Sequence, residues 1–163
     1  MSQELVKPWR DLEGYKRLRL LEAKYEAELA AKFLEQGLIR NAAGKAFQAW
    51  KALMAALLAD KRDELLKLYP GEKKLRKGRG KVAFADWLIA VVPTSYMEEL
   101  SLLLLGEEVN LYTEKALAIH EYQYNGPDRE GVLSPFRNDE IAKANVLMLL
   151  KEINKVLRSL GVS

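Results

Sequence analysis

The chain has 163 residues and a mass of 18.5 kDa, which is about the length of one domain. Hydrophobic residues make up 49% of it and charged residues 30%, a composition that excludes disordered and collagen-like chains. It has no cysteine and one histidine, which excludes disulfides, thiolate metal sites, cysteine nucleophiles and a multi-histidine site. We therefore expect a single domain over residues 1–163, with its core at about 11–160, no metal and no cofactor.

The net charge of +3 is distributed unevenly along the chain. Residues 1–81 contain 19 Lys and Arg against 11 Asp and Glu, whereas residues 82–163 contain 7 against 12. The two parts therefore carry +8 and −5, which predicts a basic face and an acidic face. Such a surface favours binding of an anionic partner or self-association. The alternative is that the charges serve only the solubility of the protein.

Two long amphipathic helices are expected first, because apolar residues recur at spacings of three and four. The first runs over about 11–36, and Gly37 ends it. The second begins with Asn41 as its N-cap and continues, with a bend, to Leu68. The short connection predicts an antiparallel hairpin of helices with Phe47 and Trp50 buried between them. The residues expected to face inward from the first helix are Leu18, Leu21, Tyr25, Leu29 and Phe33.

A basic segment, residues 72–81, follows the second helix, and Gly78 and Gly80 predict a flexible loop there. Each Lys or Arg that reaches a phosphate releases a counterion, so this segment could give salt-dependent binding of RNA or DNA. No aromatic residue interrupts the segment, so base stacking is not expected within it. The alternative is a solvated connection between two pairs of helices. The candidate phosphate-binding residues are Lys73, Lys74, Arg76, Lys77, Arg79 and Lys81.

Four more helices are expected, over about 82–91, 96–105, 109–124 and 138–160. Ser95 and Glu98 match a capping box for the second of these four. No segment alternates with a period of two, so we predict an all-α fold, a single up-and-down bundle of about five to six helices. The inward residues of the last helix are expected to be Ile141, Met148, Ile153, Val156 and Leu160.

No targeting or membrane segment is visible in the sequence. The first residues lack a basic stretch followed by an apolar one, and the longest uncharged apolar run, 87–92, is far shorter than the roughly 20 residues that cross a bilayer. We expect a cytoplasmic protein without a membrane partner.

The dipeptide Gly44-Lys45 does not belong to a phosphate-binding loop, although it resembles the end of one. Such a loop needs a glycine at position 39 and a hydroxyl residue at 46, where this chain has Ile39 and Ala46. The segment is also expected to be helical. Small residues there instead predict close packing between helices.

His120 is the one side chain whose unperturbed pKa lies near neutrality, so a general acid–base proposal starts from it. On a helix it shares a largely apolar face with Thr113, Ala116 and Tyr124. The alternative to a functional histidine is therefore a partly buried structural one. Glu114 and Glu121 share another face, but the chain has no E-x-x-H partner of the kind that di-iron bundles use.

Three stretches of the chain carry a family resemblance: FLEQG at 33–37, RNAAGKAFQAWKA at 40–52 and AIHEYQYNG at 118–126. They resemble the archaeal PaREP family, which is similar to the HEPN superfamily (higher eukaryotes and prokaryotes nucleotide-binding). The resemblance covers about residues 12–160. It implies an up-and-down bundle, frequent homodimers, and a relationship to toxin ribonucleases and to partner subunits of nucleotidyltransferases.

Active HEPN ribonucleases carry an arginine followed, after four to six residues, by a histidine. Before His120 the corresponding positions are Lys115, Glu114 and Thr113, so the arginine is missing. Lysine keeps the charge but lacks the planar fork that binds phosphate, and a step of five residues turns about 140° around a helix.

These observations predict a non-catalytic binding or partner subunit that forms a homodimer. Its expected partner is a nucleotide, an RNA that it binds weakly, or a nucleotidyltransferase. One alternative is a metal-independent ribonuclease that uses Lys115 and His120. Another is a structural interaction module with no nucleic-acid role.

Overall fold

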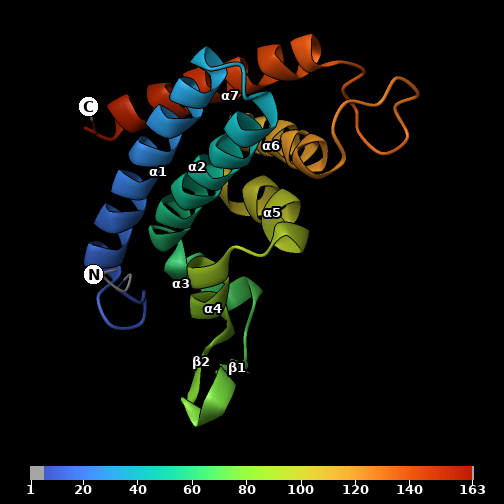
Figure 1. Ribbon diagram of the computed structural model, residues 1–163. Helices are drawn as coiled ribbons and strands as arrows, with labels where there is room; N and C mark the ends of the chain where they lie inside the picture. The colour runs from blue at the N-terminus through green and yellow to red at the C-terminus, as the bar shows by residue number, and fades with distance from the viewer. Residues whose placement is uncertain (1–5, 163) are drawn as a thin grey trace.

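The computed structural model describes residues 6–162 and is mostly helical (Figure 1). Two short antiparallel strands, β1 (Glu72–Lys74) and β2 (Lys81–Ala83), are the only β-structure in that range. The prediction of an all-α fold is confirmed. Over these residues, seven α-helices replace the expected six because the second is interrupted at residues 60–61. The helices are α1 (Leu12–Glu35), α2 (Ile39–Ala59), α3 (Arg62–Leu68), α4 (Phe84–Val91), α5 (Thr94–Leu100), α6 (Glu107–Asn125) and α7 (Asp139–Ser159).

Helix α2 lies at the centre of the fold, packed against α1, α4, α6 and α7. Its small residues Ala42, Ala43, Gly44 and Ala46 are fully or almost fully buried, which confirms the predicted close packing. Trp50 and Phe47 are also buried, as predicted.

The partners of these two rings differ from the prediction, because both rings contact α6. The indole Nε1 of Trp50 donates to Thr113 Oγ1 over 3.0 Å, and the ring of Phe47 stacks on His120 with centroids 4.0 Å apart. The large rings fill the space between α2 and α6, whereas α1 meets α2 largely through small side chains.

The predicted core stripe of α1 is only partly right: Phe33 packs against the core, but Leu21 and Tyr25 do not, and alanine explains the error. The face that packs inward contains Ala23, Ala27 and Ala30, which are at most 4% exposed. Leu21 and Tyr25, expected in the core, are 41% and 57% exposed. Small side chains let the axes of α1 and α2 come close, so the large apolar residues lie outside the contact.

The predicted inward face of α7 is also partly wrong. Ile153 is buried, but Ile141, Met148 and Leu160 are all exposed. The buried face of α7 instead contains Ala142, Val146, Leu149, Leu150, Ile153 and Leu157.

The predicted helix caps at Asn41 and at Ser95 with Glu98 are wrong as well. Helix α2 begins at Ile39 and α5 at Thr94, so both capping candidates lie inside helices. Side-chain caps occur instead on α1, where Asp11 accepts from the amide of Gly14, and on α7, where Asn138 accepts from Ile141, each over 2.9 Å.

The segment predicted as a flexible loop, 72–81, forms a β-hairpin that extends away from the helices (Figure 1). Lys73 pairs with Val82 and Lys74 with Lys81. The tip turns through Lys77 and Gly78, whose φ angles are +58° and +67°. Strands of three residues are too short to show an alternating pattern, and that is why the sequence did not indicate them.

Among the described residues, no single helix is long and apolar enough to cross a membrane. Within residues 6–162, one bent pair of segments, 84–91 and 94–105, which meet at 105°, reaches that length and composition. Leu88, Ile89, Met97 and Leu100 of this pair are fully buried in the protein core.

Candidate functional site

The hairpin concentrates positive charge that the rest of the described chain does not neutralise. Lys74, Arg76, Lys77, Arg79 and Lys81 are all exposed, and Lys73 is partly buried. Within residues 6–162, none of these six forms an ion pair with a carboxylate. The structure therefore brings all six predicted phosphate-binding residues together on one projecting element.

Four aromatic side chains lie at the base of the hairpin, a feature that the sequence reasoning missed. Tyr69 follows α3, Phe84 and Trp87 lie on α4, and Tyr96 lies on α5. Neighbouring rings in this aromatic cluster have centroids 5.7–6.3 Å apart. The sequence signal that could have indicated this cluster is the pair Phe84 and Trp87, which are three residues apart and lie just after the basic segment.

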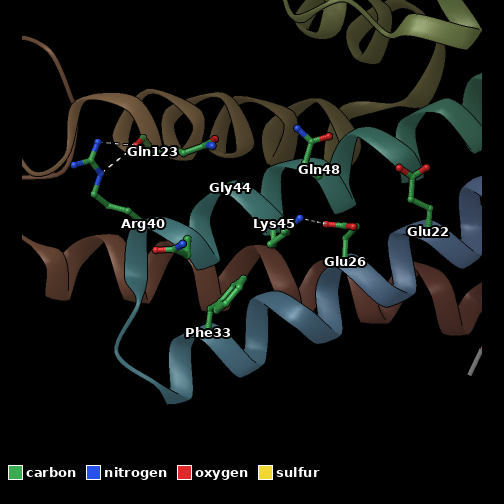
Figure 2. Close-up of a pocket in the computed structure, with 9 residues that line it drawn as sticks. Glu22, Glu26, Phe33, Arg40, Gly44, Lys45, Gln48 and Gln123 are labelled. Carbon is green, nitrogen blue, oxygen red and sulfur yellow. Dashed lines mark hydrogen bonds and ion pairs between the residues drawn. The ribbon is translucent and has the colours of Figure 1, made fainter. Parts of the chain in front are cut away.

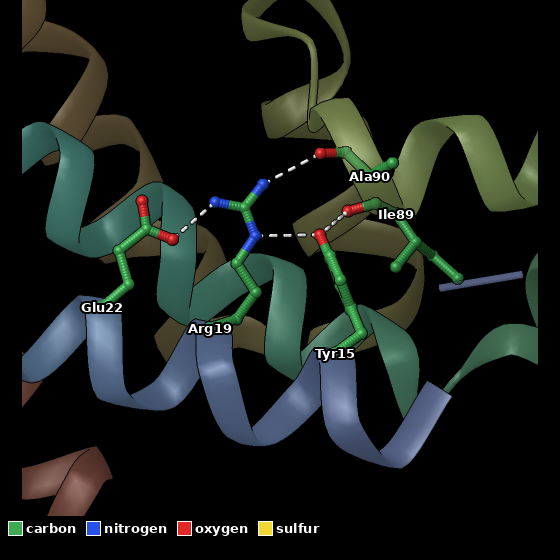
Figure 3. A network of polar contacts seen from close by, with 5 residues as sticks. All are labelled: Tyr15, Arg19, Glu22, Ile89 and Ala90. Atoms are coloured by element: carbon green, nitrogen blue, oxygen red, sulfur yellow. Dashed lines mark hydrogen bonds and ion pairs between the residues drawn. The ribbon is translucent and has the colours of Figure 1, made fainter. Parts of the chain in front are cut away.

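A network of polar contacts holds α4 against α1 (Figure 3). Tyr15 donates its hydroxyl to the carbonyl of Ile89 over 2.6 Å, and Arg19 Nη2 donates to the carbonyl of Ala90 over 2.9 Å. Arg19 also donates through Nε to Tyr15 and through Nη1 to Glu22. The last carbonyls of a helix lack partners within it, so this network satisfies the end of α4 and fixes its position.

A second contact fixes the other end of α4. Arg62 of α3 donates to both oxygens of Asp86, over 2.7 and 3.0 Å, and Asp86 is only 3% exposed. Because β2 ends at Ala83, immediately before α4, both contacts also position the base of the hairpin.

An open groove of about 610 Å³ lies over α2 and between α1 and α6 (Figure 2). All three stretches that carry the family resemblance contribute to it. Its lining residues are Glu22, Glu26, Phe33, Arg40, Asn41, Gly44, Lys45, Gln48 and Gln123.

Close contact between α2 and the end of α6 shapes one end of the groove. Arg40 donates through Nε to the carbonyl of Gln123 over 3.1 Å, and through Nη2 to that of Tyr124 over 2.8 Å. Gly44 lies directly against the Gln123 side chain, so that a β-carbon there would come within 2.7 Å of its Nε2. The groove is therefore built from residues far apart in the sequence.

Charges in the groove are largely paired, in contrast to those of the hairpin. Lys45 Nζ lies 3.4 Å from Glu26 Oε2, and Arg19 Nη1 lies 2.7 Å from Glu22 Oε2. Arg40 is occupied with the carbonyls of α6. The groove therefore offers polar contacts without a strong net field.

Lys115 and His120 are not brought together. Lys115 donates from Nζ to Asn145 of α7 over 2.6 Å, whereas His120 stacks on Phe47 of α2 and meets Tyr124 edge-on at 5.0 Å. Burial, with a smaller contribution from the charge of Lys51, lowers the pKa of His120 below its ordinary value.

No cluster of three or more potential metal ligands occurs in residues 6–162. Glu114 and Glu121 are both exposed on α6.

Comparison with known proteins gives one result. The model of the archaeal PaREP1/PaREP8 family matches residues 18–147, a range that includes the groove, the hairpin and the aromatic cluster. No curated protein and no solved structure is similar enough to this chain to count as a match.

Proposed function

The chain belongs to the archaeal PaREP1/PaREP8 family, and we propose that it is a HEPN-like, non-catalytic module that binds RNA weakly through its basic hairpin. The observation that carries this proposal is the set of six cations on a projecting element, none of them paired with a carboxylate of the described chain. Phosphates along an RNA strand are the partners that such a set fits best.

The position of the hairpin adds to this argument. Because the hairpin extends beyond the helices (Figure 1), its five exposed cations can contact the phosphates of a strand that passes along it. The two contacts that hold α4 keep these charges in a fixed relation to the protein body.

The separation of Lys115 and His120 supports a non-catalytic role over the ribonuclease alternative. A general acid and a phosphate-binding cation must reach the same substrate, but these two side chains contact different helices. The lowered pKa of His120 also leaves less of the imidazolium form at neutral pH.

The test is a fluorescence-anisotropy titration of a single-stranded RNA at several salt concentrations. Six phosphate contacts give a log–log slope of about −4, at roughly 0.7 per phosphate. The double variant Arg76→Ser/Arg79→Ser should flatten this slope by about one to one and a half.

A matched control removes two exposed cations of α7, a helix that lies far from the hairpin in Figure 1; it is the double variant Lys151→Ser/Arg158→Ser. This control should keep the wild-type slope. Equal affinity of the wild type and the hairpin variant at low salt would contradict the proposal and favour the structural interaction module.

We also propose that the chain forms a homodimer through the outer face of α1. Leu21 and Tyr25 are exposed there, with Leu18 and Leu29 partly exposed on the same stripe. Light scattering should give twice 18.5 kDa at tens of micromolar, and Leu21→Glu/Tyr25→Glu should return the monomer mass. A wild-type monomer at these concentrations would reject this part of the proposal.

A further inference from the structure

The aromatic cluster and the hairpin form one continuous surface, and Lys73 connects them. Lys73 lies on β1 opposite Val82, and both are partly buried, whereas Lys74 and Lys81 are exposed. The Nζ of Lys73 lies 4.6 Å from the centre of the Trp87 ring. One of the six cations therefore turns toward the rings while the other five face solvent.

The rings are not sealed inside the core. Tyr69, Phe84, Trp87 and Tyr96 each keep part of their surface exposed. Trp87 and Phe84 are nearly parallel, at 15°, and the ammonium of Lys73 covers part of the indole. An ammonium on an exposed ring is held weakly, so a flat ligand can replace it.

Phosphate contacts alone do not distinguish a single strand from a duplex, but aromatic rings do. Bases in a duplex are stacked on one another, whereas those of a single strand are free to stack on side chains. A positively charged groove next to aromatic rings is the arrangement by which single strands are bound without sequence preference.

We propose that Trp87, together with Phe84, is a stacking platform for bases of a single-stranded nucleic acid whose phosphates lie along the hairpin. On binding, a base takes the place of the Lys73 ammonium on the indole, and Lys73 becomes free to contact a phosphate. This inference rests on the proposed function, because the hairpin must first hold the strand. It adds the ligand class: single strands with bases, rather than polyanions in general.

The first experiment compares a single-stranded RNA with an abasic strand of the same length, which has the phosphates but no bases. The wild type should bind the RNA about tenfold more tightly than the abasic strand. Trp87→Leu should bind both strands alike with an unchanged salt slope, and Trp87→Phe should keep most of the preference. Equal affinity of the wild type for both strands would overturn the proposal.

The second experiment does not depend on the stability of a Trp87 variant. In Trp9→Phe the remaining tryptophans are Trp50, which is fully buried, and Trp87. Fluorescence should be quenched by single-stranded RNA, but not by an abasic strand, a blunt duplex or polyglutamate. Absence of quenching by bound RNA would overturn the proposal.

The two proposals fail in different ways. If Arg76→Ser/Arg79→Ser leaves the salt slope unchanged, RNA binding by the hairpin is rejected. If the slope changes as expected but Trp87 fluorescence does not respond, only the stacking is rejected. If polyglutamate displaces the bound RNA as well as free RNA does, the result would indicate an acidic protein partner and overturn the stacking proposal.

Discussion

The hairpin and the groove both contain cations, but they differ in what surrounds them. In the groove, Lys45 and Arg40 are occupied by a carboxylate and by carbonyls of α6. On the hairpin, the described chain supplies no carboxylate partner. The number of Lys and Arg residues is thus a poor guide to an anion site, and the fraction left unpaired is a better one.

The two regions also differ in their relation to the core. The groove lies directly over α2, whose side chains form much of the core, whereas the hairpin lies outside it (Figure 1). Changes around the groove should therefore alter the free energy of unfolding, and changes in the hairpin should not.

The largest effect is expected for Trp50→Ala, which removes the buried ring between α2 and α6. It should lower the free energy of unfolding by about 3–5 kcal/mol, because it leaves a cavity and removes the hydrogen bond from the indole to the Thr113 hydroxyl. Chemical denaturation measures this change. A loss below about 1 kcal/mol would contradict the burial of Trp50 between α2 and α6.

Arg40→Ala should have the next largest effect, about 1–2 kcal/mol, because it removes the hydrogen bonds to the last carbonyls of α6. Arg17→Ala, an exposed arginine on α1, is the matched control and should change stability by less than about 0.5 kcal/mol. Equal effects of the two variants in the same denaturation experiment would contradict the role given to Arg40.

A smaller effect is expected from the titration of His120. Its pKa is lower in the folded protein than in the unfolded chain, mainly because of burial, so protonation favours unfolding. The contribution of the neutral His120 to the free energy of unfolding is complete above about pH 6.5, the pKa of histidine in the unfolded chain. It is lost as the pH falls through the lower pKa of His120 in the folded protein. Thermal melts between pH 7.5 and 5.5 should show this loss in the wild type and a weaker pH dependence in His120→Phe.

The smallest effect on stability is expected for Arg76→Ser/Arg79→Ser. Exposed charges outside the core contribute little to the free energy of unfolding. The variant should therefore lose less than about 0.5 kcal/mol and melt at nearly the temperature of the wild type. Differential scanning calorimetry measures this. A marked loss of stability would show that the hairpin is coupled to the core and would remove the contrast between the two regions.

The sequence predicted most helices because their periodicity extends over several turns, but it could not predict which faces meet. Leu21 and Tyr25 had the pattern of a core stripe, yet alanines occupy the contact between α1 and α2. Periodicity detects an apolar face. Where a helix has two such faces, only the position of the neighbouring helix shows which of them is buried.

The candidate sites were predictable to different degrees. The basic residues of the hairpin all lie within residues 73–81, so the sequence placed them together, although not on strands. The aromatic cluster draws on three elements, with Tyr69 and Tyr96 27 positions apart in the printed sequence. The groove combines α1, α2 and α6, and only tertiary packing brings Glu26 and Gln123 to the same opening.

The projection of the hairpin has a consequence for the kinetics of RNA capture. An exposed arm with a high net positive charge accelerates the encounter with a polyanion, and salt reduces this acceleration. Contacts at the aromatic cluster form only after the encounter, so they prolong the residence of the strand instead. Ionic strength should therefore act mainly on the rate of association, and substitution of Trp87 mainly on the rate of dissociation.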